Sequence, residues 1–262
     1  MKNDEAYKNG AYIPGADDFV PRWVEAAAAW RKAMGRRAEL RLSYGPNDRH
    51  WLDFFHPEGP AKGTFVFVHG GYWRAFDASY WSHFARGALA QGWAVAMPSY
   101  DLCPDVSIAD ITQQIAEALA AIAARTDGPI ALAGHSAGGH LVARMLDPAV
   151  LPDALRARIV SVLPISPLSD LEPLIETQMN ADFGLDVASA RAESPLDQPR
   201  PVACDVTVWV GADEQPAFLD QAAWLAQAWA ADHVIAPGRH HFDVIDDLQD
   251  PQSAMIAAVL RL

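Results

Sequence analysis

Short apolar runs that alternate with helical patterns constrain the fold of this chain more than any other feature. A continuous, β-branched apolar run is typical of a strand that is buried on both faces. Such runs occupy residues 64–68, 94–97, 130–133, 159–165, 206–210 and 233–235. Helical patterns occupy residues 79–91, 107–124, 137–146, 217–230 and 252–260. Strands that alternate with helices predict an α/β fold, with a mostly parallel sheet and helices on both faces.

The chain begins differently. Residues 19–35 are rich in alanine and predict a helix that ends near Gly35. Residues 38–44 and 51–55 are two short alternating runs, and Gly45-Pro46-Asn47-Asp48 between them is a strong turn signal. They predict a hairpin, which is compatible with an antiparallel edge on a parallel sheet.

One later segment breaks the alternation. Residues 167–201 are rich in Pro, Asp, Glu and Ser and have no sustained period. Loops of this length inside a compact domain are usually functional. We therefore expect this excursion to lie over the mouth of the site and to form a partial lid together with the N-terminal residues. No repeat or linker divides the chain, so we expect residues 1–262 to form one domain.

Composition limits the partners. The formal net charge is −13, and such a surface repels nucleic-acid phosphates and anionic membranes. No run of about 20 apolar residues is present, which argues against a membrane span. Two cysteines, Cys103 and Cys204, are too few for a disulfide framework. No apolar run follows the charged N-terminus, so we expect a cytoplasmic protein.

The strongest local motif is Gly134-His135-Ser136-Ala137-Gly138. It matches the glycine-x-serine-x-glycine turn that exposes a nucleophilic serine between a buried strand and a helix. The required context is present, because a predicted strand precedes the motif and a predicted helix follows it. The alternative is an ordinary glycine-rich turn with no catalytic role. We favour Ser136 as a nucleophile.

Paired glycines follow the strand at residues 64–68, in His69-Gly70-Gly71-Tyr72-Trp73. In acyl-transfer enzymes, backbone N–H groups of such a loop stabilise the oxyanion together with the residue after the nucleophile. Here the donors would be Gly70 or Gly71, and Ala137. The alternative is a tight turn without a ligand. Because His69 precedes the turn, we expect it to be a structural hydrogen-bonding residue rather than a base.

The base of such a site is a histidine late in the chain, because this fold orders its catalytic residues as serine, acid, histidine. His240 and His241 are the candidates, and we favour His241 because Phe242 can anchor the loop just beyond it. Adjacent histidines rarely bind one metal ion together, so we expect no metal. The acid is expected after the strand at residues 206–210, where Asp213 and Glu214 both qualify.

These motifs together resemble the kynurenine formamidase (arylformamidase) branch of the α/β-hydrolases, which belongs with the hormone-sensitive-lipase-like esterases. The resemblance covers about residues 40–250. Further matching stretches are residues 98–104, residues 166–171, and Pro216-Ala217-Phe218 with Gln221 close behind. The resemblance implies Ser136 as nucleophile, His241 as base and Gly70 and Gly71 as the oxyanion loop. It places the acid three residues after Gly211, at Glu214, with Asp213 as the fallback.

The resemblance implies hydrolysis of a small carboxylic ester or an aryl formamide through an acyl-enzyme, without a cofactor. Two alternatives remain: an acyl thioesterase of the same fold, and a catalytically silent binding protein. The expected partner is a small acyl substrate; the oligomeric state does not follow from the sequence. Aromatic residues near the motifs either line an aryl pocket or belong to the core: Tyr72, Trp73, Phe76, Tyr80 and Trp81. We expect Tyr72 and Trp73 to contact the substrate.

Overall fold

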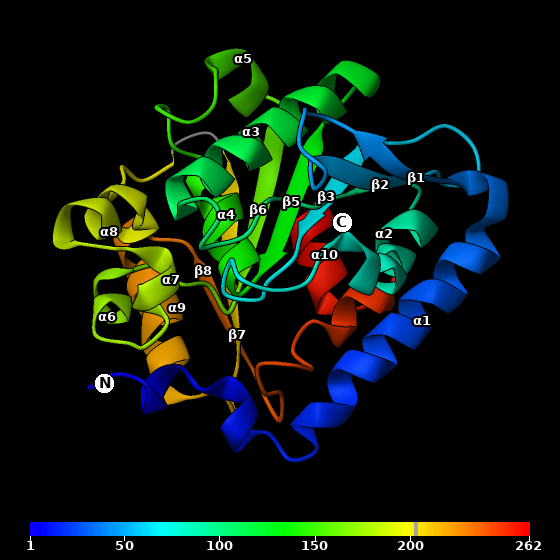
Figure 1. Ribbon diagram of the computed structural model, residues 1–262. Helices are drawn as coiled ribbons and strands as arrows, with labels where there is room; N and C mark the ends of the chain where they lie inside the picture. Colours follow the sequence, from blue (N-terminus) through cyan, green and yellow to red (C-terminus); the bar gives the residue numbers. More distant parts are fainter. Residues whose placement is uncertain (202–203) are drawn as a thin grey trace.

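The computed structural model describes residues 1–201 and 204–262 and has an eight-stranded sheet at its centre (Figure 1). The strands are β1 (Ala38–Ser43), β2 (Trp51–Phe55), β3 (Thr64–Val68), β4 (Ala94–Pro98), β5 (Ile130–His135), β6 (Ile159–Ile165), β7 (Asp205–Gly211) and β8 (Asp232–Ala236). Their order across the sheet is β1-β2-β4-β3-β5-β6-β7-β8. Strand β2 pairs antiparallel with β1 and β4, and the other neighbours are parallel. This confirms the predicted α/β class and its antiparallel edge.

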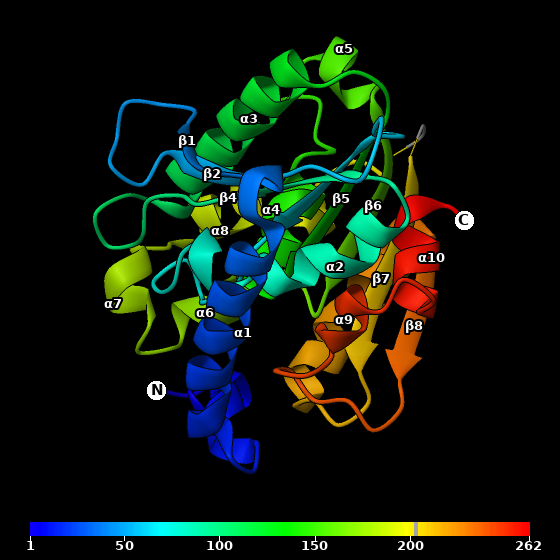
Figure 2. The same cartoon turned by 90° about the vertical axis from the view of Figure 1, so that its right-hand side faces the viewer.

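Helices cover both faces of the sheet (Figures 1 and 2). They are α1 (Phe19–Met34), α2 (Arg86–Ala90), α3 (Ile108–Arg125), α4 (Ala137–Arg144), α5 (Asp153–Arg156), α6 (Glu172–Ile175), α7 (Asn180–Phe183), α8 (Val187–Glu193), α9 (Pro216–Trp229) and α10 (Ala254–Leu260). Local chemistry sets several of their ends. Ser107 and Ser253 cap α3 and α10 with their hydroxyl groups. Gly35 ends α1 at a φ of +53°, a conformation that glycine adopts easily.

Two segments differ from the sequence prediction. The single helix expected over residues 79–91 is two 3₁₀ turns (Ala78–Tyr80 and Ser82–Ala85) followed by the short helix α2. Every residue from Trp81 to Ala85 is buried, and tertiary packing of this kind overrides a local helical pattern. The excursion at residues 167–201, in which we saw no period, contains α6, α7 and α8.

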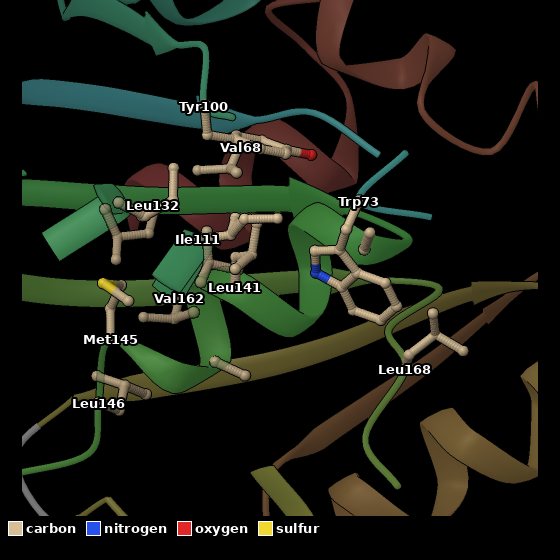
Figure 3. Close-up of a cluster of buried hydrophobic side chains, with 14 of the residues drawn as sticks. Val68, Trp73, Tyr100, Ile111, Leu132, Leu141, Met145, Leu146, Val162 and Leu168 are labelled. Carbon is tan, nitrogen blue, oxygen red and sulfur yellow. The ribbon is translucent and has the colours of Figure 1, made fainter. Parts of the chain in front are cut away.

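The core consists of two apolar layers, one on each side of the sheet. Alternate residues of a strand point to opposite faces: in β3, Val66 and Val68 pack under α3 and α4, whereas Phe65 and Phe67 face α1, α2 and α10. Figure 3 shows part of the first layer, where Val68 and Leu132 lie among side chains of the covering helices. Burial on both faces explains why the central strands appear in the sequence as continuous apolar runs.

The N-terminal segment and the excursion lie at the same end of the molecule (Figures 1 and 2). The N–H of Asn3 donates to the carbonyl of Glu176, at 3.2 Å. The hydroxyl of Tyr7 accepts a hydrogen bond from Gln221 of α9, at 3.1 Å. This brings the start of the chain to the carboxyl ends of the parallel strands, where α/β sheets bind ligands. Within the described residues, no helix has the length and hydropathy needed to cross a membrane.

Candidate active site

Ser136 lies on a sharp turn between β5 and α4. Its φ is +56°, in a region that residues with a side chain rarely adopt. The two motif glycines make the turn possible: a Cβ on Gly134 would lie 2.1 Å from the carbonyl oxygen of Gly138, and one on Gly138 would lie 2.0 Å from that of Val68. No side chain fits at either position. The predicted strand–turn–helix context is therefore present, and the turn holds Ser136 in a strained backbone conformation.

The loop after β3 approaches this turn closely. A Cβ on Gly70 would lie 2.7 Å from the carbonyl oxygen of His135, so only glycine allows the approach. Gly71 has a φ of +111°, and a Cβ there would lie 2.5 Å from the carbonyl oxygen of Ala75. The loop also holds Tyr72 at a φ of +52°. Such a concentration of sparsely populated conformations is typical of functional loops.

His69 fixes the direction of the Gly70–Gly71 peptide. Its Nδ1 lies 2.7 Å from the carbonyl oxygen of Gly70 and must donate to it. In a trans peptide the N–H of Gly71 then points the opposite way, away from His69. The His69 ring stacks on Tyr100 with a centroid distance of 4.2 Å, and burial lowers its pKa to about 4. A neutral, buried histidine agrees with the structural role that we expected from the sequence.

Ala137 is the first residue of α4. The N–H groups in the first turn of a helix have no acceptor within the helix, and the helix dipole favours negative charge at this end. The N–H groups of Gly71 and Ala137 therefore belong to two segments that meet at Ser136. This is the arrangement that an oxyanion requires, with donors on both sides of the reacting carbonyl.

Glu214, and not Asp213, contacts His241. Oε2 of Glu214 lies 2.6 Å from Nδ1 of His241, and the Glu214 side chain is fully buried. Asp213 is exposed to solvent. The carboxylate therefore accepts the Nδ1 proton and leaves Nε2 as the proton acceptor of the ring, which is the tautomer that a general base needs.

Two further donors hold the other oxygen of Glu214. Oε1 accepts hydrogen bonds from the N–H of Gly211, at 2.8 Å, and from the hydroxyl of Ser166, at 2.5 Å. The sequence analysis placed Ser166 in a stretch shared with the related family but gave it no role. Its one signal there was its position directly after a predicted strand.

His240 has a different environment from its neighbour. Its Nδ1 accepts hydrogen bonds from the N–H groups of Phe242 and Asp243, at 3.1 and 3.3 Å. Its ring packs against Phe19 with a centroid distance of 5.3 Å. These contacts shape the turn that carries His241, and among the described residues no hydrogen bond or ion pair joins His240 to Glu214.

His135 lies between the serine turn and the loop of the base. Its Nε2 donates to the carbonyl oxygen of His241, at 2.8 Å, and the two rings are 4.6 Å apart. Burial lowers the pKa of His135 well below its ordinary value, so the ring is neutral. No hydrogen bond joins Ser136 to His241 among the described residues; such contacts often tighten when substrate binds.

Ser136 and His241 line one cavity of about 710 Å³, a size that suits a small organic ligand. One wall is apolar, and four of its aromatic side chains pack edge to face or tilted on one another: Trp23, Phe76, Trp81 and Phe242. Another part of the lining comes from the N-terminal segment, including Tyr7 and Asn9. Sequence analysis expected a contribution from the N-terminal residues but did not identify these side chains.

Another part of the lining carries charge. Arg74, in the glycine loop, forms an ion pair of 2.6 Å with Asp182 of α7, and both line the cavity. The excursion at residues 167–201 therefore reaches the cavity through Asp182. A smaller cavity of about 360 Å³ adjoins the first and shares Tyr7, Lys8, Arg74 and Asp182 with it.

The structure corrects one of the two aromatic expectations. Tyr72 lines the cavity, and its hydroxyl donates to the carbonyl of Tyr7, at 2.8 Å. Trp73 does not line it: its side chain is fully buried in the core, against His140 and Phe183. Figure 3 shows Trp73 among apolar side chains near Leu168. Adjacent residues of this loop point in different directions, and the sequence does not reveal which one faces the cavity.

Comparison with known proteins agrees with this architecture. A family model described as an alpha/beta hydrolase family matches residues 65–259. The chain belongs to the α/β-hydrolase family. At the level of fold, it superimposes on an esterase of Pyrobaculum calidifontis with a TM-score of 0.71 and 17% identity, over 94% of this chain and 93% of the other.

More similar proteins fall into two groups. Kynurenine formamidase of Drosophila melanogaster is 29% identical over 229 residues, which cover 79% of this chain and 75% of the relative. The enzyme of the same name from Salmo salar is 23% identical and covers 94% of this chain and 90% of its own. A crystal structure from Silicibacter sp. TM1040, described provisionally as a thioesterase, is 61% identical with a TM-score of 0.98 and covers 99% of both chains.

Proposed function

We propose that this protein is a serine hydrolase that cleaves a small carboxylic ester or an aryl formamide through an acyl-enzyme. The 2.6 Å contact between Glu214 and His241 carries the proposal, since it orients an imidazole in the cavity that Ser136 also lines. Nucleophile, base and acid follow one another in the chain in the order of this fold. The proposed roles are Ser136 as nucleophile, His241 as base and Glu214 as acid.

In the first half of the reaction, the Ser136 hydroxyl oxygen attacks the substrate carbonyl carbon while Nε2 of His241 takes its proton. Glu214 stabilises the imidazolium that forms. The oxyanion accepts hydrogen bonds from Ala137 and from the Gly70–Gly71 loop, each worth about 2.7–4 kcal/mol in a comparable site. The tetrahedral intermediate then collapses, the bond to the leaving group breaks, and His241 returns its proton to that group.

In the second half, water replaces the leaving group. His241 takes a proton from the water as its oxygen attacks the acyl carbon, and the same N–H groups stabilise the second oxyanion. Collapse breaks the bond to Ser136, and His241 gives the proton back to the serine oxygen. The products are a carboxylic acid, or formic acid from a formamide, and the regenerated hydroxyl.

The aromatic wall supports an aryl group as part of the substrate. It runs from Phe242, next to the base, to Trp23 and Phe76, and such walls bind flat apolar groups through burial and edge-to-face packing. The similarity to kynurenine formamidases, which extends over most of the chain, points the same way. A fold alone does not define a substrate, so this choice depends on the cavity.

An acyl thioester is the second candidate substrate. The observation that favours it is the 61% identical structure described provisionally as a thioesterase. The same nucleophile, base and oxyanion donors serve a thioester, because its carbonyl passes through the same tetrahedral intermediate. The leaving group distinguishes the candidates: an aryl amine or alcohol in one case, and a thiol in the other.

Parallel kinetics test the proposal. N-formylkynurenine, p-nitrophenyl acetate and butyrate, and acetyl and butyryl thioesters are assayed with the wild-type enzyme and with Ser136→Ala as the matched control. We expect hydrolysis that requires Ser136, with the highest kcat/KM for the aryl formamide or aryl esters. A higher kcat/KM for the thioesters would favour the second candidate. Turnover of none of them, together with no fluorophosphonate labelling, would support a binding protein instead.

A further inference from the structure

Ser166 is a buried serine whose backbone has a conformation that residues with a side chain rarely adopt. It follows β6 directly, its side chain is fully buried, and its φ is +48°. A residue with a Cβ is strained in this left-handed region, where glycine is not. Strained residues persist where the surroundings hold them, and they cluster at functional sites. The Ser166 side chain is therefore a candidate for a functional role.

The Ser166 hydroxyl binds the carboxylate that orients the base. Oγ of Ser166 lies 2.5 Å from Oε1 of Glu214, a length typical of an O–H donor on an ionised carboxylate. The same oxygen accepts the N–H of Gly211, at 2.8 Å. Oε1 is thus held from the ends of two neighbouring strands, β6 and β7, and Oε2 is left to meet His241, at 2.6 Å.

The Glu214 side chain does not by itself set the plane of its carboxylate. Its last torsion joins an sp³ to an sp² carbon and has no sharp preferred angle. The N–H of Gly211 alone fixes the position of Oε1 but not the plane of the carboxylate. A second donor on the same oxygen fixes that plane as well. Without it, Oε2 can swing away from His241, and the imidazole loses its orientation.

We infer that Ser166 is a positioning residue of the active site, which acts through Glu214 and does not touch the substrate. The inference rests on the proposed function, in which Glu214 is the acid. Ser166 and Gly211 hold one carboxylate oxygen so that the other stays directed at Nδ1 of His241. The strained backbone at Ser166 is retained because it places the hydroxyl there.

A comparison of Ser166→Ala with Ser166→Gly separates the hydrogen bond from the backbone strain. Both variants lose the hydroxyl, and only glycine also relieves the strain, so the thermal midpoint of Ser166→Gly is expected to equal or exceed that of Ser166→Ala. In both variants we expect kcat for p-nitrophenyl acetate to fall about 10- to 100-fold, by analogy with the loss of an orienting hydrogen bond behind a metal ligand, with KM nearly unchanged. Full kcat in a folded Ser166→Gly variant would overturn the inference.

A matched control is Ser169→Ala. Ser169 is also buried and lies three residues further on, but its hydroxyl binds Gln221 instead of Glu214. This variant is expected to lower the thermal midpoint and to leave kcat unchanged within about twofold, because the hydrogen bonds that it removes go to Gln221 and not to Glu214. An equal loss of kcat in Ser169→Ala would mean that any defect in this segment reduces activity, and the inference would fail.

A double-mutant cycle tests the route through Glu214. In a Glu214→Gln background no carboxylate remains to be held, so adding Ser166→Gly should change the rate of fluorophosphonate labelling by less than about twofold. Equal effects of Ser166→Gly in both backgrounds would assign Ser166 a purely structural role. The outcome is separable from the proposed function: loss of activity in Ser136→Ala with full activity in Ser166→Gly refutes this inference alone.

Discussion

At the scale of single residues, the choice between Glu214 and Asp213 shows how burial assigns a role. The two carboxylates are adjacent, yet one is fully buried against His241 and the other is exposed. A buried carboxylate without partners is unfavourable, and Glu214 has three: His241, Gly211 and Ser166. Resemblance to a family directed us to Glu214, whereas the residue types alone left both open.

Substitution of the two carboxylates tests this assignment. Glu214→Gln should reduce kcat by up to about four orders of magnitude, because an amide favours the wrong histidine tautomer. Asp213→Asn should change kcat by less than about twofold, since the Asp213 side chain is exposed to solvent and exposed charges contribute little. Steady-state kinetics with p-nitrophenyl acetate measure both. A severe loss in Asp213→Asn with a mild one in Glu214→Gln would reverse the assignment.

The two adjacent histidines offer a second test at this scale. His241→Ala should be almost as inactive as Ser136→Ala, because residues that act as a unit show strongly non-additive losses. His240→Ala removes the acceptor for the N–H groups of Phe242 and Asp243 and the packing against Phe19, so it should lower the free energy of unfolding by at least about 1 kcal/mol and retain most of kcat. Kinetics and urea denaturation of both variants provide the comparison. An inactive, folded His240→Ala would exchange the two roles.

At the scale of elements, α1 is a helix with two functions. It packs on the sheet through Trp23 and Met34, and Trp23 also lines the cavity. The alanine-rich pattern predicted the helix correctly. It did not predict that the helix reaches the site, because its contact with the loops after β3 and β8 joins residues more than 50 positions apart. Long-range packing of this kind leaves no local signal in a single sequence.

A substitution in α1 tests the aromatic wall. Trp23→Leu shortens the wall next to Phe76 and Phe242, so KM for aryl substrates such as phenyl acetate should rise about tenfold or more. The kinetic constants for ethyl acetate, which lacks an aryl group, should change far less. Trp30→Leu is the matched control, since Trp30 lies on the same helix but not on the cavity wall. Equal effects on both substrates would show that the wall does not select aryl groups.

At the scale of the whole molecule, buried neutral histidines make stability depend on pH. Burial lowers the pKa of His69 and His83 to about 4 and that of His140 to about 3, and it lowers the pKa of His135 as well. The unfolded chain binds protons at these sites below about pH 6.5, whereas the folded chain does not. The unfolded state therefore gains protons first, and stability falls as the pH drops from about 6.5 to 4.

We expect the free energy of unfolding to fall by up to about 1.4 kcal/mol per pH unit for each of these histidines. Burial raises the pKa of Asp246 to about 6. The folded chain therefore binds a proton at this carboxyl before the unfolded chain does, which partly offsets the fall in stability. Urea midpoints between pH 7.5 and 4.5 measure how steeply stability falls with pH. His140→Gln removes one of these histidines, so it should reduce that slope by up to about 1.4 kcal/mol per pH unit. A flat stability profile over this range would contradict the expectation.

The sequence predicted the sheet better than its surroundings. Central strands such as β3 and β6 are buried on both faces, so their apolar runs are continuous and their bounds match the prediction. The segment around Trp81 and Phe84 was wrong as a single helix, because tertiary burial there overrides the helical pattern. The glycine motifs predicted the turns correctly, since a side chain at Gly70, Gly134 or Gly138 would clash with a neighbouring carbonyl oxygen. The direction of Trp73 and the partner of Ser166 depend on packing and were not predictable.

The central claim is that Ser136 is a nucleophile activated by His241, and covalent labelling tests it most directly. Wild-type protein, Ser136→Ala and His241→Ala are incubated with a fluorophosphonate, and intact masses are recorded over time. The account predicts one adduct on the wild type, mapped to Ser136 by peptide sequencing, none on Ser136→Ala and a greatly slowed one on His241→Ala. An adduct that forms equally fast on Ser136→Ala, or a folded wild-type protein that is never labelled, would contradict the account.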